Sequence, residues 1–165
     1  MTLIVEDGTG LSTAQSYVSV ADADARFDGL GLDNWSTLTP AEKEQALRRA
    51  TVYMEQAYRT RWTGQRKTRD QALSWPRYDV IVDGYWFPSD SIPAAIANAC
   101  ADLALRAAAG DLAEDTTRAI IREKVGPLET EYDAHSPQGV KYRAIDMALA
   151  PYLTGGGTMF RLVRA

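Results

Sequence analysis

Apolar residues recur at helical spacing in four stretches of this chain, and residues that start or stop helices bound each stretch. A capping pattern at Ser19 predicts a short first helix that ends in the glycine-rich residues 29–31. The second helix has the clearest start, because Thr39 and Glu42 flank a proline as in a capping box. Its apolar stripe predicts a helix that runs to about Trp62.

The other two helices are predicted from the same signals. Ser91 is expected to cap a third, alanine-rich helix that Gly110 closes. Abundant alanine favours close packing of helix backbones, as in the centre of a small bundle. A fourth helix is expected to start near Ser136 and to be limited by Pro151.

Two segments between the helices alternate in a way typical of β-hairpins. The first lies near 78–88, where Asp83 and Gly84 separate two β-prone runs. The second lies near 120–132, with Gly126 and Pro127 in its loop. The expected register brings opposite charges and apolar residues together in separate pairs, namely Arg122 with Glu131, Lys124 with Glu129, Val125 with Leu128, and Ile121 with Tyr132.

The C-terminal residues 155–165 form a glycine hinge followed by a tail. Gly155, Gly156 and Gly157 have no side chains to pack, and the tail beyond them alternates almost as a strand. The tail is expected either to add to a sheet edge of another subunit or to fold back onto its own domain beside residues 3–5. Together these patterns predict a mainly α fold: a small four-helix bundle over residues 1–154, with one or two β-hairpins and an extended C-terminal tail.

Positive charge is concentrated in residues 58–78, which we call the basic segment. Its six cations and one carboxylate give +5, which leaves −9 for the rest of a chain whose net charge is −4. Two tryptophans lie among the cations, and guanidinium groups beside indoles suit phosphate contacts, base stacking or acidic surfaces of another protein. The candidate residues are Arg59, Arg61, Trp62, Arg66, Lys67, Arg69 and Arg77, with Trp75 as a second indole.

The remaining composition gives little support for catalysis. The 165 residues contain one histidine, His135, and one cysteine, Cys100, so no Cys/His metal cluster and no nucleophile with its base can be recognised. Cys100 is expected in the core, and the acid pairs of the predicted helices, such as Asp22 with Asp24, are interpreted as solvated charges. No apolar run approaches the length of a membrane span, and no basic leader precedes one. We expect a soluble non-enzyme without catalytic residues, cofactor, metal or membrane partner.

Several ordered segments together resemble a known family. They are IVEDGTG, SYVSVADADARF, QALSWPR, IPAAIANACADLAL, REKVGPLETEY and RLVRA, and they span nearly the whole chain. The chain resembles tailed-bacteriophage proteins labelled DnaT-like single-stranded-DNA-binding proteins, and through them the head-tail connector (adaptor) proteins of long-tailed phages. The aromatic run 85–87 is not part of this resemblance, and its plain interpretation is a hairpin that packs over the core.

The resemblance implies a structural virion protein at the head-tail interface, assembled in the host cytoplasm. Such a protein forms a homo-oligomeric ring, dodecameric by resemblance, below the portal, extends the channel for packaged double-stranded DNA, and receives the next connector (stopper) or tail protein. Carried onto this chain, it makes the tail a portal or subunit contact through Met159, Phe160, Arg161, Leu162, Val163 and Arg164. It makes the second hairpin a subunit or tail contact through Arg122, Lys124, Glu129 and Glu131.

Two functions of different classes follow. We rank the connector ring first, with most cations of the basic segment bridging subunits. The alternative is a single-stranded-DNA-binding protein of phage origin, which predicts salt-dependent affinity and quenching of Trp62 or Trp75 by oligonucleotides.

Overall fold

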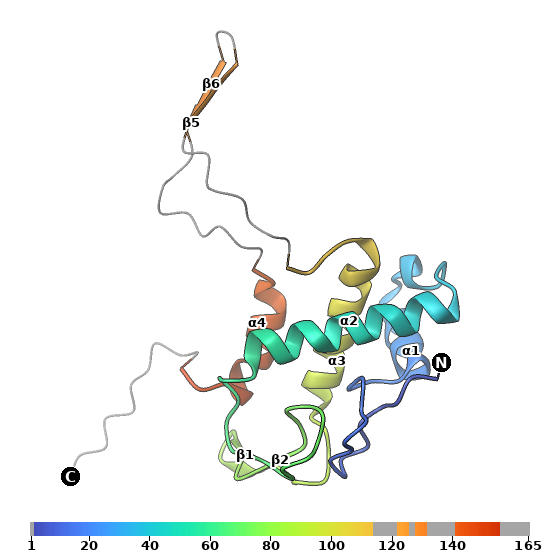
Figure 1. Ribbon diagram of the computed structural model, residues 1–165, viewed down its shortest axis with the longest axis vertical. Helices are drawn as coiled ribbons and strands as arrows, with labels where there is room; N and C mark the ends of the chain where they lie inside the picture. Colours follow the sequence, from blue (N-terminus) through green and yellow to red (C-terminus); the bar gives the residue numbers. More distant parts are fainter. Residues whose placement is uncertain (1, 114–121, 126–127, 132–140, 156–165) are drawn as a thin grey trace, which may run out of the picture.

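Four α-helices, two 3₁₀ helices and three two-stranded antiparallel sheets occur in the described residues of the computed structural model, which are 2–113, 122–125, 128–131 and 141–155 (Figure 1). The helices are α1 (Val20–Leu30), η1 (Asp33–Trp35), α2 (Pro40–Tyr58), α3 (Ala94–Ala109), α4 (Arg143–Leu149) and η2 (Ala150–Tyr152). The strands are β1 (Gln65–Arg66), β2 (Arg77–Tyr78), β3 (Ile81–Val82), β4 (Tyr85–Trp86), β5 (Arg122–Val125) and β6 (Leu128–Glu131). No helix in these ranges is both long and apolar enough to cross a membrane.

The starts of α1 and α2 confirm the predicted caps. The Ser19 hydroxyl accepts a hydrogen bond from the Asp22 amide at 3.0 Å, and α1 ends at Gly31, whose φ of 66° is left-handed. At α2, the Thr39 hydroxyl accepts from the Glu42 amide while the Glu42 carboxylate accepts from the Thr39 amide. These reciprocal bonds satisfy backbone donors that an uncapped first turn leaves without partners.

Helix α2 ends at Tyr58 rather than near Trp62, and the backbone partners of the next residues explain why. The Thr63 amide donates to the Tyr152 carbonyl at 2.9 Å, and the Thr154 amide donates to the Arg61 carbonyl at 2.6 Å. Groups that would continue the helix are therefore bonded to the chain around η2, far away in sequence. This pairing includes the bridge between Trp62 and Leu153.

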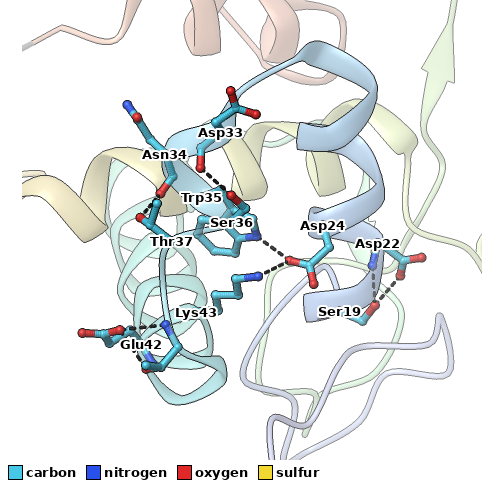
Figure 2. Close-up of polar contacts among 11 residues, drawn as sticks. Ser19, Asp22, Asp24, Asp33, Asn34, Trp35, Ser36, Thr37, Glu42 and Lys43 are labelled. Atoms are coloured by element: carbon cyan, nitrogen blue, oxygen red, sulfur yellow. Dashed lines mark hydrogen bonds and ion pairs between the residues drawn. The ribbon is translucent and has the colours of Figure 1, made fainter.

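Asp24 ties three elements together at one corner of the molecule (Figure 2). One of its oxygens accepts from the indole N–H of Trp35 in η1 at 2.6 Å and from Lys43 in α2 at 2.9 Å. The interpretation of the acid pairs as solvated charges is therefore wrong for this residue. The sequence does not show it, because the partners lie in separate elements.

The predicted four-helix bundle is wrong. Helix α3 packs against α2 and α4, but α3 and α4 run across α2 rather than along it, and α4 has only seven residues (Figure 1). The core also takes Trp62, Leu73, Trp75 and Val80 from a segment without helix. An aligned bundle buries continuous stripes of long helices, whereas this core is filled to a large extent by loop residues.

The hairpin predictions are largely confirmed, and one pair of strands was missed. Strands β3 and β4 flank Asp83 and Gly84 as expected, and β5 pairs with β6 in the predicted register, with Arg122 opposite Glu131. The predicted pair of Ile121 with Tyr132 lies outside the described residues. The missed pair is β1 with β2, two residues each within the basic segment.

The remaining element boundaries differ in part from the prediction. Ser91 does not cap α3, because its hydroxyl lies against the Pro88 carbonyl and Pro93 occupies the N-cap position. Gly110 ends this helix as predicted. Cys100 is fully buried, as expected. Helix α4 begins at Arg143 and not near Ser136 as predicted, because residues 141–142 are not helical and no side chain caps its first turn. His135 and the tail beyond Gly155 lie outside the described residues.

Candidate nucleic-acid interface

The two tryptophans of the basic segment lie in the core. Trp62 is 5% exposed and Trp75 is fully buried, and their rings meet edge to face with centroids 5.9 Å apart. Trp75 makes two further edge-to-face contacts, with Phe87 at 5.9 Å and with Tyr152 at 5.8 Å. Such contacts between aromatic rings stabilise a packed core. Neither indole therefore offers a face on which a base could stack.

The backbone of the basic segment folds tightly enough to enclose these rings. Gly64 has a φ of +68°, and a Cβ atom there would lie 2.3 Å from the Tyr78 carbonyl oxygen. Gln71 is buried, and its side-chain amide donates to the carbonyls of Leu73 and Pro76 at 2.9 and 3.0 Å. The loop thus satisfies its backbone groups internally, as a buried loop must.

Arg77 is a structural residue of this loop. It is 8% exposed, and its guanidinium donates to the carbonyls of Thr63 at 2.6 Å, Gly64 at 2.7 Å and Ser74 at 3.1 Å. Burial lowers the pKa of Arg77 from its ordinary value, because desolvation disfavours the charged form. The three carbonyls occupy the fork of donors that would otherwise bind a phosphate or a carboxylate.

Two further cations also bond to backbone carbonyls. Arg66 donates to the Gln71 carbonyl, and Lys67 donates to the Gly8 carbonyl at 2.9 Å. The contact of Lys67 fastens the N-terminal loop to the basic segment, so both cations hold the fold together. Of the predicted cations, Arg59 and Arg69 are exposed and Arg61 is half-buried.

The half-buried Arg61 lies over a ring that marks the end of α2. Its guanidinium carbon is 5.8 Å from the centroid of Tyr58, whose hydroxyl donates to Asp146 of α4 at 2.7 Å. Burial, followed by the hydrogen bond to Asp146, raises the pKa of the Tyr58 hydroxyl well above its usual range. The hydrogen bond between Tyr58 and Asp146 therefore fixes the end of α2, next to which Arg59 and Arg61 lie.

The two most exposed aromatic residues in the described part of the chain lie on the hairpin of β3 and β4. Tyr85 is 79% exposed, Trp86 is 68% exposed, and Ile81 opposite Trp86 is 50% exposed. Within the described residues, the side chains of Tyr85 and Trp86 make no hydrogen bond and no contact with another aromatic ring. The expectation that residues 85–87 pack over the core is confirmed for Phe87 only.

The register of the hairpin predicts which of its apolar side chains face solvent, and this prediction was missed from the sequence. Val80 and Val82 are on the face that packs inward with Phe87, so Ile81 and Trp86 must point to the opposite face. A solvent-facing pair is ordinarily polar. Because the turn at Asp83 and Gly84 fixes the pairing, the sequence alone could have predicted that the apolar residues Ile81 and Trp86 pair on the outer face.

The aromatic hairpin is connected to the end of α2 by a short series of contacts. Phe87, next to Trp86, packs edge to face with Tyr152 of η2 at 6.3 Å. The Tyr152 carbonyl accepts from both the amide and the hydroxyl of Thr63, two residues after Arg61. The exposed rings of the hairpin and the cations Arg59 and Arg61 at the end of α2 are thus attached to the same part of the core.

The other predicted site residues belong to the hairpin of β5 and β6 and to the C-terminal tail. Arg122, Lys124, Glu129 and Glu131 lie in β5 and β6, in the charge-pairing register that the sequence predicted. The docking residues 159–164 lie outside the described residues. No group of three or more metal-ligating side chains occurs in the described part of the chain. The assignment of the chain as a non-enzyme stays a prediction.

Comparison with known proteins yields one match. Searches of curated proteins and of solved structures find no similar protein. A family model described as "Putative DnaT-like ssDNA binding protein" matches residues 1–165. This match favours the DNA-binding alternative over the connector, and the ring, the portal, the tail partners and the virion neck stay predictions. Because the match covers the whole chain, the protein belongs to the DnaT-like single-stranded-DNA-binding protein family.

Proposed function

We propose that this protein binds single-stranded DNA. The observation that carries the proposal is the family match over the whole chain. The surface supports it at one place, where the exposed Arg59, the half-buried Arg61 and the exposed rings of the β3–β4 hairpin are attached to one part of the core. Cations for phosphates and rings for bases are the two groups that binding of a single strand requires.

Contact with phosphates is assigned to Arg59, Arg61 and Arg69, the three residues of the basic segment that the fold does not use as carbonyl donors. Outside the basic segment the chain has a net charge of −9, so a polyanion is repelled from much of the remaining surface. Binding is therefore local, and it has modest affinity that falls as salt increases.

The direct test measures the fluorescence anisotropy of a labelled oligothymidylate as protein is added, at several salt concentrations between about 20 and 200 mM. Each neutralised phosphate contributes about −0.7 to the slope of log K against log salt for a single strand, so three contacts give a slope near −2. Absence of binding at the lowest salt contradicts the proposal. Equal affinity for a duplex of the same length contradicts its preference for single strands.

Charge-neutralising variants locate the phosphate contacts. Arg59→Gln and Arg69→Gln are each expected to reduce the magnitude of the salt slope by about 0.7. The matched control is Arg49→Gln, which removes an exposed arginine of α2 outside the basic segment. If Arg49→Gln changes the slope as much as the other two variants, the basic segment is not the phosphate-contacting surface.

A further inference from the structure

The outer face of the β3–β4 hairpin is apolar, although nothing in the described residues covers it. Trp86 and Ile81 are direct cross-strand partners, and they are 68% and 50% exposed. In a hairpin with a two-residue loop this is the pair that lacks mutual hydrogen bonds, in which side chains approach each other most closely. Ile81 is therefore the nearest cross-strand neighbour of the indole, and most of the Trp86 surface is exposed.

The backbone of the hairpin holds the indole of Trp86 in place. Asp83 and Gly84 both have positive φ, 52° and 86°, as a turn of type I′ requires. The Phe87 amide donates to the Val80 carbonyl at 2.8 Å, which extends the pairing toward the core. Val80 is fully buried, so the base of the hairpin is anchored while its tip projects. A ring on such a support loses little conformational freedom when it binds a flat ligand.

We infer that Trp86, with Ile81 beside it on the outer face of the hairpin, forms a base-stacking site for single-stranded DNA. This inference rests on the proposed function, and it assigns a part of the chain that neither the family match nor the sequence resemblance assigns. The site complements the arginines of the basic segment: the indole of Trp86 contacts a base, and Arg59 and Arg61 at the end of α2 contact phosphates.

Charge at the hairpin also favours bases over phosphates as its ligand. Asp83 lies in the turn next to the exposed rings, and its carboxylate repels a phosphate backbone. The strand is then oriented with its bases toward the hairpin and its phosphates toward the cations of α2. A second protein copy or another protein could also cover an apolar pair, and these occupants are distinguished by the test below.

Intrinsic fluorescence gives a direct readout, because the chain has four tryptophans and only one is exposed. Trp35, Trp62 and Trp75 are at most 5% exposed, whereas Trp86 is 68% exposed. Stacking of a base on Trp86 quenches its emission. We therefore expect unlabelled oligothymidylate to quench the wild-type protein and to leave the emission of Trp86→Phe unchanged.

Affinity is measured in parallel by anisotropy with the labelled oligothymidylate. Trp86→Ala is expected to weaken binding by about 5- to 100-fold, with the salt slope unchanged. Trp86→Phe keeps a ring and should retain most of the affinity. The matched control is Leu30→Ala, which removes a 55% exposed apolar side chain at the end of α1 and should bind as the wild type does.

The outcomes separate this inference from the proposed function. If wild-type protein binds in a salt-dependent way but Trp86→Ala binds equally well, the stacking site is wrong and the proposed function stands. If wild-type protein does not bind at all, both are wrong. If Trp86→Ala converts an oligomer to a monomer by native mass measurement while DNA affinity is unchanged, the hairpin is a protein interface instead.

Discussion

Replacement of Arg77 by methionine tests whether this cation serves the fold or a ligand. The sequence places Arg77 with the other cations of the basic segment, whereas the structure surrounds its guanidinium with three backbone carbonyls. Methionine keeps an unbranched apolar stem of similar length and removes every donor. The carbonyls of Thr63, Gly64 and Ser74 would then lose these partners in a buried loop.

The cost can be estimated from those three bonds. A hydrogen bond that involves a charged group contributes about 1.5 to 3 kcal/mol to stability, and a buried acceptor left without a partner costs about 1 to 3 kcal/mol. Part of this cost is offset, because methionine avoids the desolvation that lowers the pKa of Arg77. We therefore expect Arg77→Met to reduce the free energy of unfolding by about 2 to 4 kcal/mol.

Urea unfolding followed by tryptophan fluorescence and far-ultraviolet circular dichroism measures this change. With a denaturant dependence of about 2 kcal/mol per molar, the midpoint should fall by about 1 to 2 M. The matched control is Arg69→Met, an exposed cation of the same segment, which should change stability by no more than about 0.5 kcal/mol. If the two variants unfold within 1 kcal/mol of each other, the structural role assigned to Arg77 is refuted.

Three further changes follow from the same kind of accounting. Gly64→Ala places a Cβ atom 2.3 Å from the Tyr78 carbonyl oxygen, so it should lower the urea midpoint more than Gly31→Ala, which has a similar φ but open space around it. Thr39→Ala removes the N-cap of α2 and should cost about 1 kcal/mol in urea unfolding, and an unchanged midpoint would contradict the role of the cap. Burial and the neighbouring Glu55 carboxylate raise the pKa of Tyr17. The protonated hydroxyl therefore contributes fully to the free energy of unfolding below the unfolded pKa of about 10, and this contribution is lost as pH rises further. Tyr17→Phe should make the decline of the free energy of unfolding between about pH 10 and 11.5 less steep, and an equally steep decline would refute this.

Local signals in the sequence were sufficient for the helix caps and the hairpin turns. Ser19, Thr39 and Gly31 act through backbone groups within a few residues of themselves, so spacing alone specifies their geometry. The turn at Asp83 and Gly84 fixes a register in the same way. The early end of α2 could not be predicted, because it depends on bonds between Thr63 and Tyr152, which are distant in sequence.

The basic segment shows why composition misassigned the candidate site. Six cations and two indoles in one short segment look like a binding surface, but exposure was assumed rather than derived. Trp62 and Trp75 are apolar enough to be buried, and once they are buried the loop around them needs donors for its carbonyls. Arg66 and Arg77 supply those donors, and Lys67 donates to the Gly8 carbonyl of the N-terminal loop. Most of the residues that suggest DNA contact in the sequence therefore pack in the core or bond to its backbone carbonyls.

The aromatic residues near the basic segment fall into two groups, one packed in the core and one exposed on the hairpin. Four of the rings near the basic segment, those of Trp62, Trp75, Phe87 and Tyr152, pack edge to face with one another in the core. Trp86 is excluded from that packing because alternate residues of a strand point to opposite faces, and Tyr85 is exposed because it lies at the tip of the hairpin, beyond the core. A sequence that needed only a stable hairpin would be expected to place polar residues there. Keeping two large rings in water, beside a core that already has enough aromatic residues, is best explained by a ligand with flat apolar faces.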